Sequence, residues 1–253
     1  MKAKIKARLK TVLRDKFTKH NPEPAYMPFH TGLLGADRMA LYSFIHSLNT
    51  NFGTSIFEQV AQDLALPHFD EVQRQKKLGK KISQNAEREI QNIMNALSSG
   101  EKNPNKKAEL AKILKVAQSG EFSTLKATRV DLFLRKGDAV FLIDIKSAKP
   151  NRGESKGFKQ TLLTWAALYA VENPRAKIHT LIAIPYNPYF PKDYERWTFK
   201  GMLDFKEELK VAEEFWDFLG GPGSYQMLLE AFEEVGKEMR QEIDDFFAKF
   251  NAK

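Results

Sequence analysis

The segment RVDLFLRKGDAVFLIDIK, residues 129–146, carries the strongest secondary-structure signal in the chain. Two runs rich in β-branched and aromatic residues, 129–134 and 139–146, flank the tetrapeptide RKGD, whose composition is typical of a turn. Two such runs joined by a short turn that contains glycine predict a β-hairpin.

The residues after this hairpin predict a helix and then a further strand. Within residues 156–171, apolar and aromatic side chains recur at helical spacing. The segment IHTLIAI, residues 178–184, is almost continuously apolar, as expected for a strand that is covered on both faces. A strand, a helix and a second strand in this order predict a right-handed crossover onto a parallel neighbour. We therefore expect an α/β fold with a mixed central sheet flanked by helices.

Further helices are expected around this core, within a single domain over residues 1–253. Residues 71–118 are rich in lysine and predict a basic helical insertion, which either is solvated or faces a polyanion. Residues 201–253 predict an acidic helical C-terminal region. The predicted helices, including those of the segments already named, span residues 1–19, 36–48, 54–65, 85–97, 106–118, 156–171, 205–219 and 224–250.

The composition excludes several classes of protein. The 253 residues contain no cysteine, which excludes disulfide frameworks, thiolate zinc sites and cysteine nucleophiles. No apolar run approaches the roughly 18–20 residues that span a bilayer, so no membrane association is expected. The N-terminus lacks the apolar region of a signal peptide, and a cytoplasmic location is therefore expected.

The charge of the chain is unevenly distributed. Residues 201–253 contain 6 basic and 13 acidic residues, a net charge of −7, whereas the first 200 residues carry a net +15. A body this basic attracts polyanions such as nucleic acids, because each neutralised phosphate releases condensed counterions. Many basic proteins bind no nucleic acid, so the charge indicates a class of partner but no chemistry.

Three side chains of the predicted hairpin form a candidate catalytic site. Asp144 and Lys146 lie two residues apart on one strand and therefore project from the same face. Asp131 lies on the partner strand, where pairing can bring it beside Asp144. Two carboxylates in contact repel each other unless a cation lies between them, and Mg²⁺ prefers such oxygen ligands.

This arrangement suggests hydrolysis of a phosphodiester by an activated water. Asp131 and Asp144 would hold the metal, which lowers the pKa of a bound water. Lys146 would orient that water and stabilise negative charge on the phosphate. The alternative is a structural Asp–Lys pair at a sheet edge.

At these residues the chain resembles the PD-(D/E)xK nuclease superfamily, with Asp131 and the tripeptide Asp144-Ile145-Lys146 as the motif. The resemblance implies a restriction-endonuclease-like core with the element order α-β-β-β-α-β. It also gives Glu58 a role, because this residue falls where many members carry a further acidic metal ligand; the alternative is a helix glutamate exposed to solvent. The first motif has Val130 where the superfamily pattern has proline, which is often absent in its members.

Longer stretches resemble type II restriction endonucleases of the TdeIII kind, from about residue 29 to residue 240. The resemblance implies a Mg²⁺-dependent endonuclease that cuts double-stranded DNA at a specific sequence and acts as a homodimer, with the acidic C-terminal helices as a candidate dimer surface. It is carried by residues 29–30, 47–50, 144–147, 149–151, 164–169 and 216–221.

The loop after the second strand of the hairpin contains the candidate DNA-binding residues. Arginine and asparagine suit bidentate contacts with guanine and adenine, and lysine suits phosphate. Two other functions remain open: a structure-specific repair or junction-resolving nuclease, and a DNA-binding module on the same fold whose metal site is idle. The candidate DNA-binding residues are Lys149, Asn151, Arg152 and Lys156.

Overall fold

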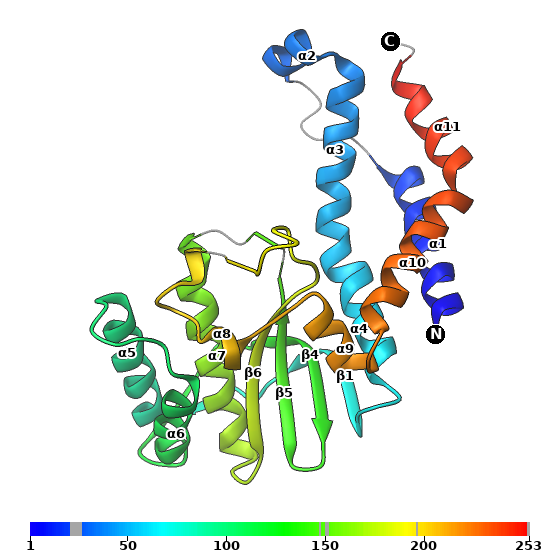
Figure 1. The fold of residues 1–253 in the computed structure, drawn as a ribbon. Helices are drawn as coiled ribbons and strands as arrows, with labels where there is room; N and C mark the ends of the chain where they lie inside the picture. Colours follow the sequence, from blue (N-terminus) through cyan, green and yellow to red (C-terminus); the bar gives the residue numbers. More distant parts are fainter. Residues whose placement is uncertain (21–26, 147, 150–151, 196, 252–253) are drawn as a thin grey trace. The chain divides into compact units, whose positions relative to one another are not determined.

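The computed structural model describes residues 1–253 except 21–26, 147, 150–151, 196 and 252–253 (Figure 1). The chain forms two compact units. The helical unit comprises residues 1–60 and 223–253, and the sheet unit comprises residues 61–222. That the whole chain acts as one nuclease domain stays a prediction.

The sheet unit is built on a five-stranded mixed sheet with the strand order β1-β4-β5-β6-β7 (Figure 1). The first three strands in this order are antiparallel, whereas β6 is parallel to β5 and β7 is parallel to β6. The predicted hairpin, the predicted parallel strand and the α/β class with a restriction-endonuclease-like core are confirmed. The strands are β1 (Glu71–Lys77), β4 (Arg129–Lys136), β5 (Ala139–Ile145), β6 (Lys177–Ile184) and β7 (Leu209–Val211).

Helices cover both faces of this sheet. On one face, Val140 and Leu142 of β5 belong to the apolar core that helix α7 (Arg152–Glu172) completes. On the other face, Phe141 lies against Phe218 of α9 (Glu213–Gly220), with ring centroids 5.1 Å apart. Side chains alternate between the two faces of a sheet along each strand, and helices cover both faces here. Every residue near the end of β6 is therefore buried, as its apolar sequence predicted.

The segment between β1 and β4, residues 78–128, belongs to the sheet unit. Its helices α5 and α6 pack against α7. Its helices and strands are β2 (Lys81–Ser83), α5 (Gln84–Ser98), α6 (Lys106–Val116) and β3 (Phe122–Thr124), and β2 pairs with β3 in a separate small sheet. The predicted helical insertion over residues 71–118 is therefore wrong at its start, because residues 71–77 form strand β1. This strand, EVQRQKK, lies at the edge of the sheet and is largely polar, so it lacks the apolar alternation of a buried strand.

The predicted helix over residues 205–219 is interrupted in the structure. The chain forms a short helix α8 (Phe205–Glu208), then β7, and then α9. Pairing of β7 with β6 satisfies the backbone of residues 209–211, and this tertiary contact overrides the local helical pattern. The acidic C-terminal region is thus helical only in part.

The helical unit has an aromatic and aliphatic core. Ile5 and Leu9 of its first helix are buried, so this basic helix, predicted over residues 1–19, packs on its own chain. Phe246 stacks on Phe17 and packs against Phe44, with ring centroids 4.8 Å and 5.0 Å away. No helix that the structure describes is long and apolar enough to cross a bilayer. The unit contains α1 (Lys2–Lys19), α2 (Pro28–Leu34), α3 (Ala36–Asn51), a π-helical turn (Phe52–Phe57), the start of α4 (Glu58–Ala65), α10 (Ser224–Glu238) and α11 (Arg240–Asn251).

Ion pairs join the basic helix α1 to the acidic helices α10 and α11. Hydrogen bonds from Lys2 and then Lys6 lower the pKa of Glu234 to about 2. The pairs, with nitrogen–oxygen distances of 2.5–2.9 Å, are Lys2–Glu230, Lys2–Glu234, Lys6–Glu234, Lys6–Glu238, Lys10–Glu238 and Arg14–Glu242.

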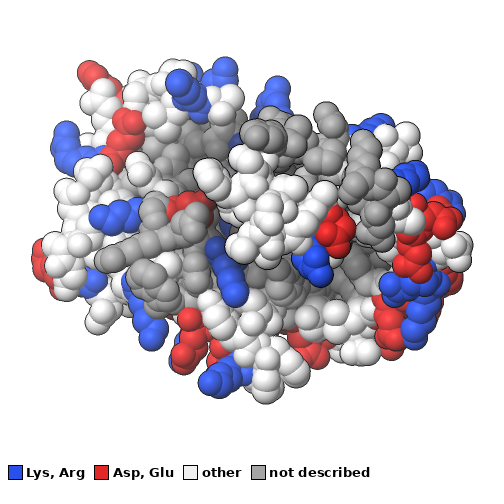
Figure 2. Space-filling view, turned by 90° about the horizontal axis from the view of Figure 1, so that it is seen from above, with Lys and Arg blue, Asp and Glu red and all other residues white. Residues whose placement is uncertain are grey.

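In these ion pairs, basic residues from the N-terminal part of the sequence meet acidic residues from the C-terminal part. The basic surplus of the N-terminal part and the acidic surplus of the C-terminal part neutralise each other along α1 and α10. Figure 2 shows blue and red side chains interleaved at the right of the view, where these helices lie. The charge asymmetry of the sequence therefore overstates the basic surface that is open to a polyanion.

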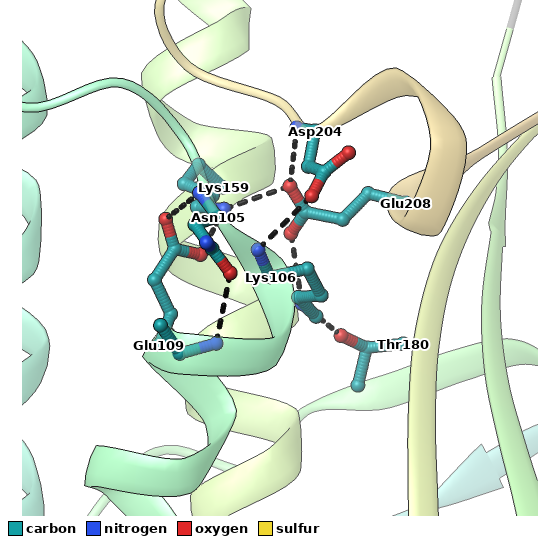
Figure 3. Close-up of polar contacts among 8 residues, drawn as sticks. Asn105, Lys106, Glu109, Lys159, Thr180, Asp204 and Glu208 are labelled. Atoms are coloured by element: carbon teal, nitrogen blue, oxygen red, sulfur yellow. Dashed lines mark hydrogen bonds and ion pairs between the residues drawn. The ribbon is translucent and has the colours of Figure 1, made fainter.

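A buried charge network fastens α6 and α8 to the core of the sheet unit (Figure 3). Glu208 of α8, 0% exposed, accepts hydrogen bonds from Lys106 at 2.8 Å and from Lys159 of α7 at 2.7 Å. Lys159 also pairs with Glu109, and Lys106 donates to the Thr180 hydroxyl of β6 at 2.6 Å. Burial lowers the pKa of Lys106, although the Glu208 carboxylate opposes this shift. Lys106 belongs to the lysine-rich segment 71–118, which was expected to be solvated or to face a polyanion, but its side chain lies inside the fold.

We expect the Glu208→Gln variant to be destabilised by about 3–5 kcal/mol, because it leaves the buried ammonium of Lys106 without a carboxylate partner and Lys159 with Glu109 alone. Urea denaturation measures the loss. The adjacent pair Lys107–Glu207 is a matched control, since Lys107 is 79% exposed. Glu207→Gln should cost less than about 1 kcal/mol. Equal stabilities of the two variants would show that the buried network does not hold these elements together.

Candidate active site

The hairpin register brings Asp131 and Asp144 together at the end of β4 and β5 that lies away from the turn. The last regular pair on this side is Leu132 with Ile143, and the two aspartates stand one step beyond it. Asp131 lies close enough to Asp144 to raise its pKa. The juxtaposition that the sequence predicted is therefore observed, and both carboxyl groups lie on one face of the sheet.

Both oxygens of Asp131 accept further hydrogen bonds. Oδ2 accepts the backbone N–H of Ile145 at 3.0 Å, and Oδ1 accepts the side-chain amide of Gln75 at 3.1 Å. These two donors come from the strands on either side of β4. These hydrogen bonds hold the Asp131 carboxylate between strands β1 and β5.

Asp144 is the buried member of the pair, with 5% of its surface exposed. Burial raises the pKa of Asp144 to about 7; Lys146 opposes this rise, and the hydrogen bond and charge of Asp131 add to it. A carboxyl group with this pKa is half-protonated at pH 7 and mostly protonated below it. Protonation of Asp144 reduces its repulsion with Asp131.

Lys146 lies next to this pair and remains accessible. Its Nζ is 2.6 Å from Oδ1 of Asp144, and 31% of its side chain is exposed. The ammonium lies 5.3 Å from the ring centroid of Phe158, on α7. The backbone N–H of Lys146 donates to the carbonyl of Ala183 on β6 at 2.9 Å, which continues the pairing of β5 with β6. Lys146 is thus positioned by the sheet and by the helix that follows it.

Glu58, the further acidic residue expected at the site, is the first residue of α4 and belongs to the helical unit. It is 4% exposed, so it is no solvated helix glutamate. Among the residues that the structure describes, no group of three or more His, Cys, Asp or Glu side chains is placed to hold a metal ion. A role for Glu58 as a ligand stays a prediction.

The candidate DNA-binding residues lie in and after the loop that follows β5. Lys149 is exposed, and its Nζ is 6.0 Å from the ring centroid of Tyr189, in the segment after β6. Tyr194 donates a hydrogen bond of 3.0 Å to the carbonyl of Ala148, which ties these two loops together. Ligands commonly bind where loops follow the carboxyl ends of parallel strands, as they do here.

Of the other three candidate DNA-binding residues, only Lys156 has a side chain that the structure describes. Lys156 is exposed on α7. Arg152 begins α7, and its side chain lies outside the described part of the chain, as does the whole of Asn151.

Gln75, which contacts Asp131, could not be predicted as a site residue. The only signal that could have pointed to it is indirect: in an α-β-β-β-α-β core, the strand before the Asp131 strand is its neighbour in the sheet. Without a strand at residues 71–77, this residue had no place beside the site. The ring of Phe158 near Lys146 was expected only as one of the apolar positions of α7.

The raised pKa of Asp144 predicts how the stability of the metal-free protein varies with pH. The unfolded chain loses this proton near pH 3.8 and the folded chain near pH 7, so the wild type loses stability between these values. Asp144→Asn does not titrate. Its advantage over the wild type in chelator should grow by up to about 1.4 kcal/mol per pH unit across this window and then level off.

Thermal and urea denaturation from pH 4 to pH 8 measure this difference. Asp138→Asn, in the exposed turn of the same hairpin, is the control and should follow the wild type. A constant gap between Asp144→Asn and the wild type would contradict the raised pKa of Asp144.

Comparisons with known proteins place this chain in a family. The model of the HinfI family of type II restriction endonucleases matches residues 1–236. The chain is 28% identical to the type II restriction enzyme MjaII of Methanocaldococcus jannaschii over 252 aligned residues, which cover 88% of this chain and 66% of that protein. It is 30% identical to the type II restriction enzymes HgiEI and HgiBI of Herpetosiphon aurantiacus, with 85% of this chain and 79% of each relative covered.

The family match includes the whole hairpin with Asp131, Asp144 and Lys146, as well as Glu58 and Gln75. The narrower resemblance to enzymes of the TdeIII kind stays a prediction. With 236 of 253 residues matched, the chain belongs to the HinfI family of type II restriction endonucleases.

Proposed function

We propose that this chain hydrolyses phosphodiester bonds of double-stranded DNA at a specific sequence, with Mg²⁺ as cofactor. The observation that carries the proposal is the contact among Asp131, Asp144 and Lys146 at the end of β4 and β5 that lies away from their turn. Membership of a restriction endonuclease family supports DNA as the substrate. The Mg²⁺ requirement rests on the chemistry of these residues and the PD-(D/E)xK assignment on the motif that they resemble. The sequence specificity rests on the resemblance to type II restriction endonucleases.

The residues present fit a hard divalent ion. Burial and the neighbouring Asp131 favour the protonated form of Asp144 in the metal-free protein, so a dication in place of that proton would relieve the repulsion between the two carboxylates. Mg²⁺ commonly binds proteins through only one or two carboxylates and completes its shell with water and substrate phosphate. Asp131 and Asp144 would be its ligands, and we propose Glu58 as a further one. The ion supplies a water of lowered pKa and neutralises charge on the phosphate.

Lys146 acts on the scissile phosphate in this proposal. Its ammonium is a compact charge beside the carboxyl pair, where a non-bridging phosphate oxygen would lie. It orients the attacking water and stabilises the negative charge that develops on phosphorus. The chain contains no cysteine, and water is the proposed nucleophile.

The DNA backbone would run over the loops after β5 and β6. Lys149 and Lys156 are exposed on this side, and we propose that they contact phosphates, with Asn151 and Arg152 available for contacts with base edges.

We propose a homodimer, because a palindromic target presents two equivalent bonds on its antiparallel strands to two copies of one site. The acidic side chains of α10 already pair with α1, which argues against them as the dimer surface. Exposed apolar side chains on α2 and α3, among them Phe29, Leu33 and Tyr42, offer a second copy an alternative surface. Sedimentation equilibrium tests the dimer, and a monomer in the presence of the DNA target would exclude it.

We expect Asp144→Ala and Lys146→Ala to lower the rate of DNA cleavage by at least about 10²-fold, because the first removes a proposed metal ligand and the second removes a positive charge beside the phosphate. The measurement is digestion of phage DNA with Mg²⁺, followed by sequencing of the fragment ends. Lys136→Ala, near the opposite end of β4, should cleave as the wild type does.

Discrete ends with a common sequence support the proposal. Ends without a common sequence, together with cleavage of flaps or four-way junctions, would indicate a structure-specific nuclease. If the wild type binds DNA but leaves it uncut, the result would indicate a DNA-binding module.

We expect Lys156→Ala to weaken binding of all duplex sequences alike and to reduce the slope of log Kd against log salt by about one, as for the loss of one phosphate contact. Fluorescence anisotropy with a labelled duplex in chelator measures both effects. Lys177→Ala is the control, since Lys177 is exposed at the opposite end of β6. An unchanged slope for Lys156→Ala would remove this residue from the interface.

A further inference from the structure

Strand β1 is distorted at the residue that faces the candidate site. Gln75 has φ +51°, in the left-handed region; Ala212 is the only other non-glycine residue with positive φ in the described part of the chain. On either side the strand is regular, with Arg74 paired to Leu132 and Lys76 paired to Val130. Gln75 therefore stands opposite Asp131, and the distortion is confined to this one position.

The distorted residue contacts a carboxyl group of the site. The Nε2 of Gln75 lies 3.1 Å from Oδ1 of Asp131, and the N–H of Ile145 binds the other oxygen at 3.0 Å. Each oxygen of Asp131 thus has a donor from a neighbouring strand. A carboxylate oxygen has two lone pairs, so each oxygen can still bind a cation.

A purely structural explanation of the distortion does not account for the residue type. Edge strands often contain bulges, but glycine or asparagine adopts a left-handed conformation with less strain than glutamine. A strained residue persists where its surroundings over-determine it, and such residues cluster at functional sites. The long side chain of glutamine, with an amide at its end, is what reaches Asp131.

We propose that Gln75 is a positioning residue for the metal site, which holds the Asp131 carboxylate in the orientation that a divalent ion requires. This inference rests on the proposed function, because it presumes that Asp131 and Asp144 bind the ion. Hydrogen-bond partners of metal ligands commonly fix the orientation of the ligand before the ion binds. Strand β1 supplies such a partner from outside the hairpin that carries the ligands.

The test is Mn²⁺ binding by the DNA-free protein, followed by the electron paramagnetic resonance signal of the free ion. Gln75→Ala and Gln75→Gly should bind Mn²⁺ about 10–100-fold more weakly than the wild type. Gln75→Gly should melt at the same temperature as the wild type or higher, because glycine removes the backbone strain. Weakened binding without lost stability is a result that a merely structural residue would not give.

Gln73→Ala is the matched control, since Gln73 lies two residues away on β1 and its amide contacts Glu71 instead. It should bind Mn²⁺ as the wild type does. Wild-type affinity in both Gln75 variants would overturn the proposal, as would equal losses in Gln75→Ala and Gln73→Ala. Asp144→Asn separates this failure from that of the proposed function: if the wild type binds no Mn²⁺, or if Asp144→Asn binds it normally, the metal site itself is wrong.

Discussion

The contact between the carboxyl groups of Asp131 and Asp144 is the constraint on which this account of the protein depends. Two acids from neighbouring strands are placed on one face of a sheet, and one of them is almost completely buried. In water such a pair would separate. The hairpin register, the Gln75 amide and the Ile145 N–H prevent separation, so repulsion within the pair is relieved by a proton on Asp144 or by a bound cation.

The rest of the sheet unit stabilises this unfavourable arrangement. Helix α7 covers the face that bears the site, and α9 covers the other face. The buried network around Glu208 connects α6 and α8 to α7 and β6, at a distance in sequence from either aspartate. Stability lost at a functional pair is commonly offset elsewhere in a fold, and a rigid scaffold is what keeps two repelling groups in contact.

The hairpin, α7 and β6 could be predicted from the sequence because their apolar periodicity is a local property. The pairing of Asp131 with Asp144 followed from the length of the turn. Strands β1 and β7 could not be predicted, since one is polar at an edge and the other lies within a helical pattern, and both depend on partners distant in sequence. Gln75 was missed with β1. The burial of Lys106 and Lys159 was missed because composition does not distinguish a paired lysine inside the fold from a solvated one.

Anomalous diffraction from crystals grown with Mn²⁺ tests the central claim most directly. A single strong peak is expected between the two carboxyl groups, within about 2.0–2.3 Å of one oxygen of Asp131 and one oxygen of Asp144. A map without a peak there, or with a peak only elsewhere, would contradict the assignment of these two residues as metal ligands.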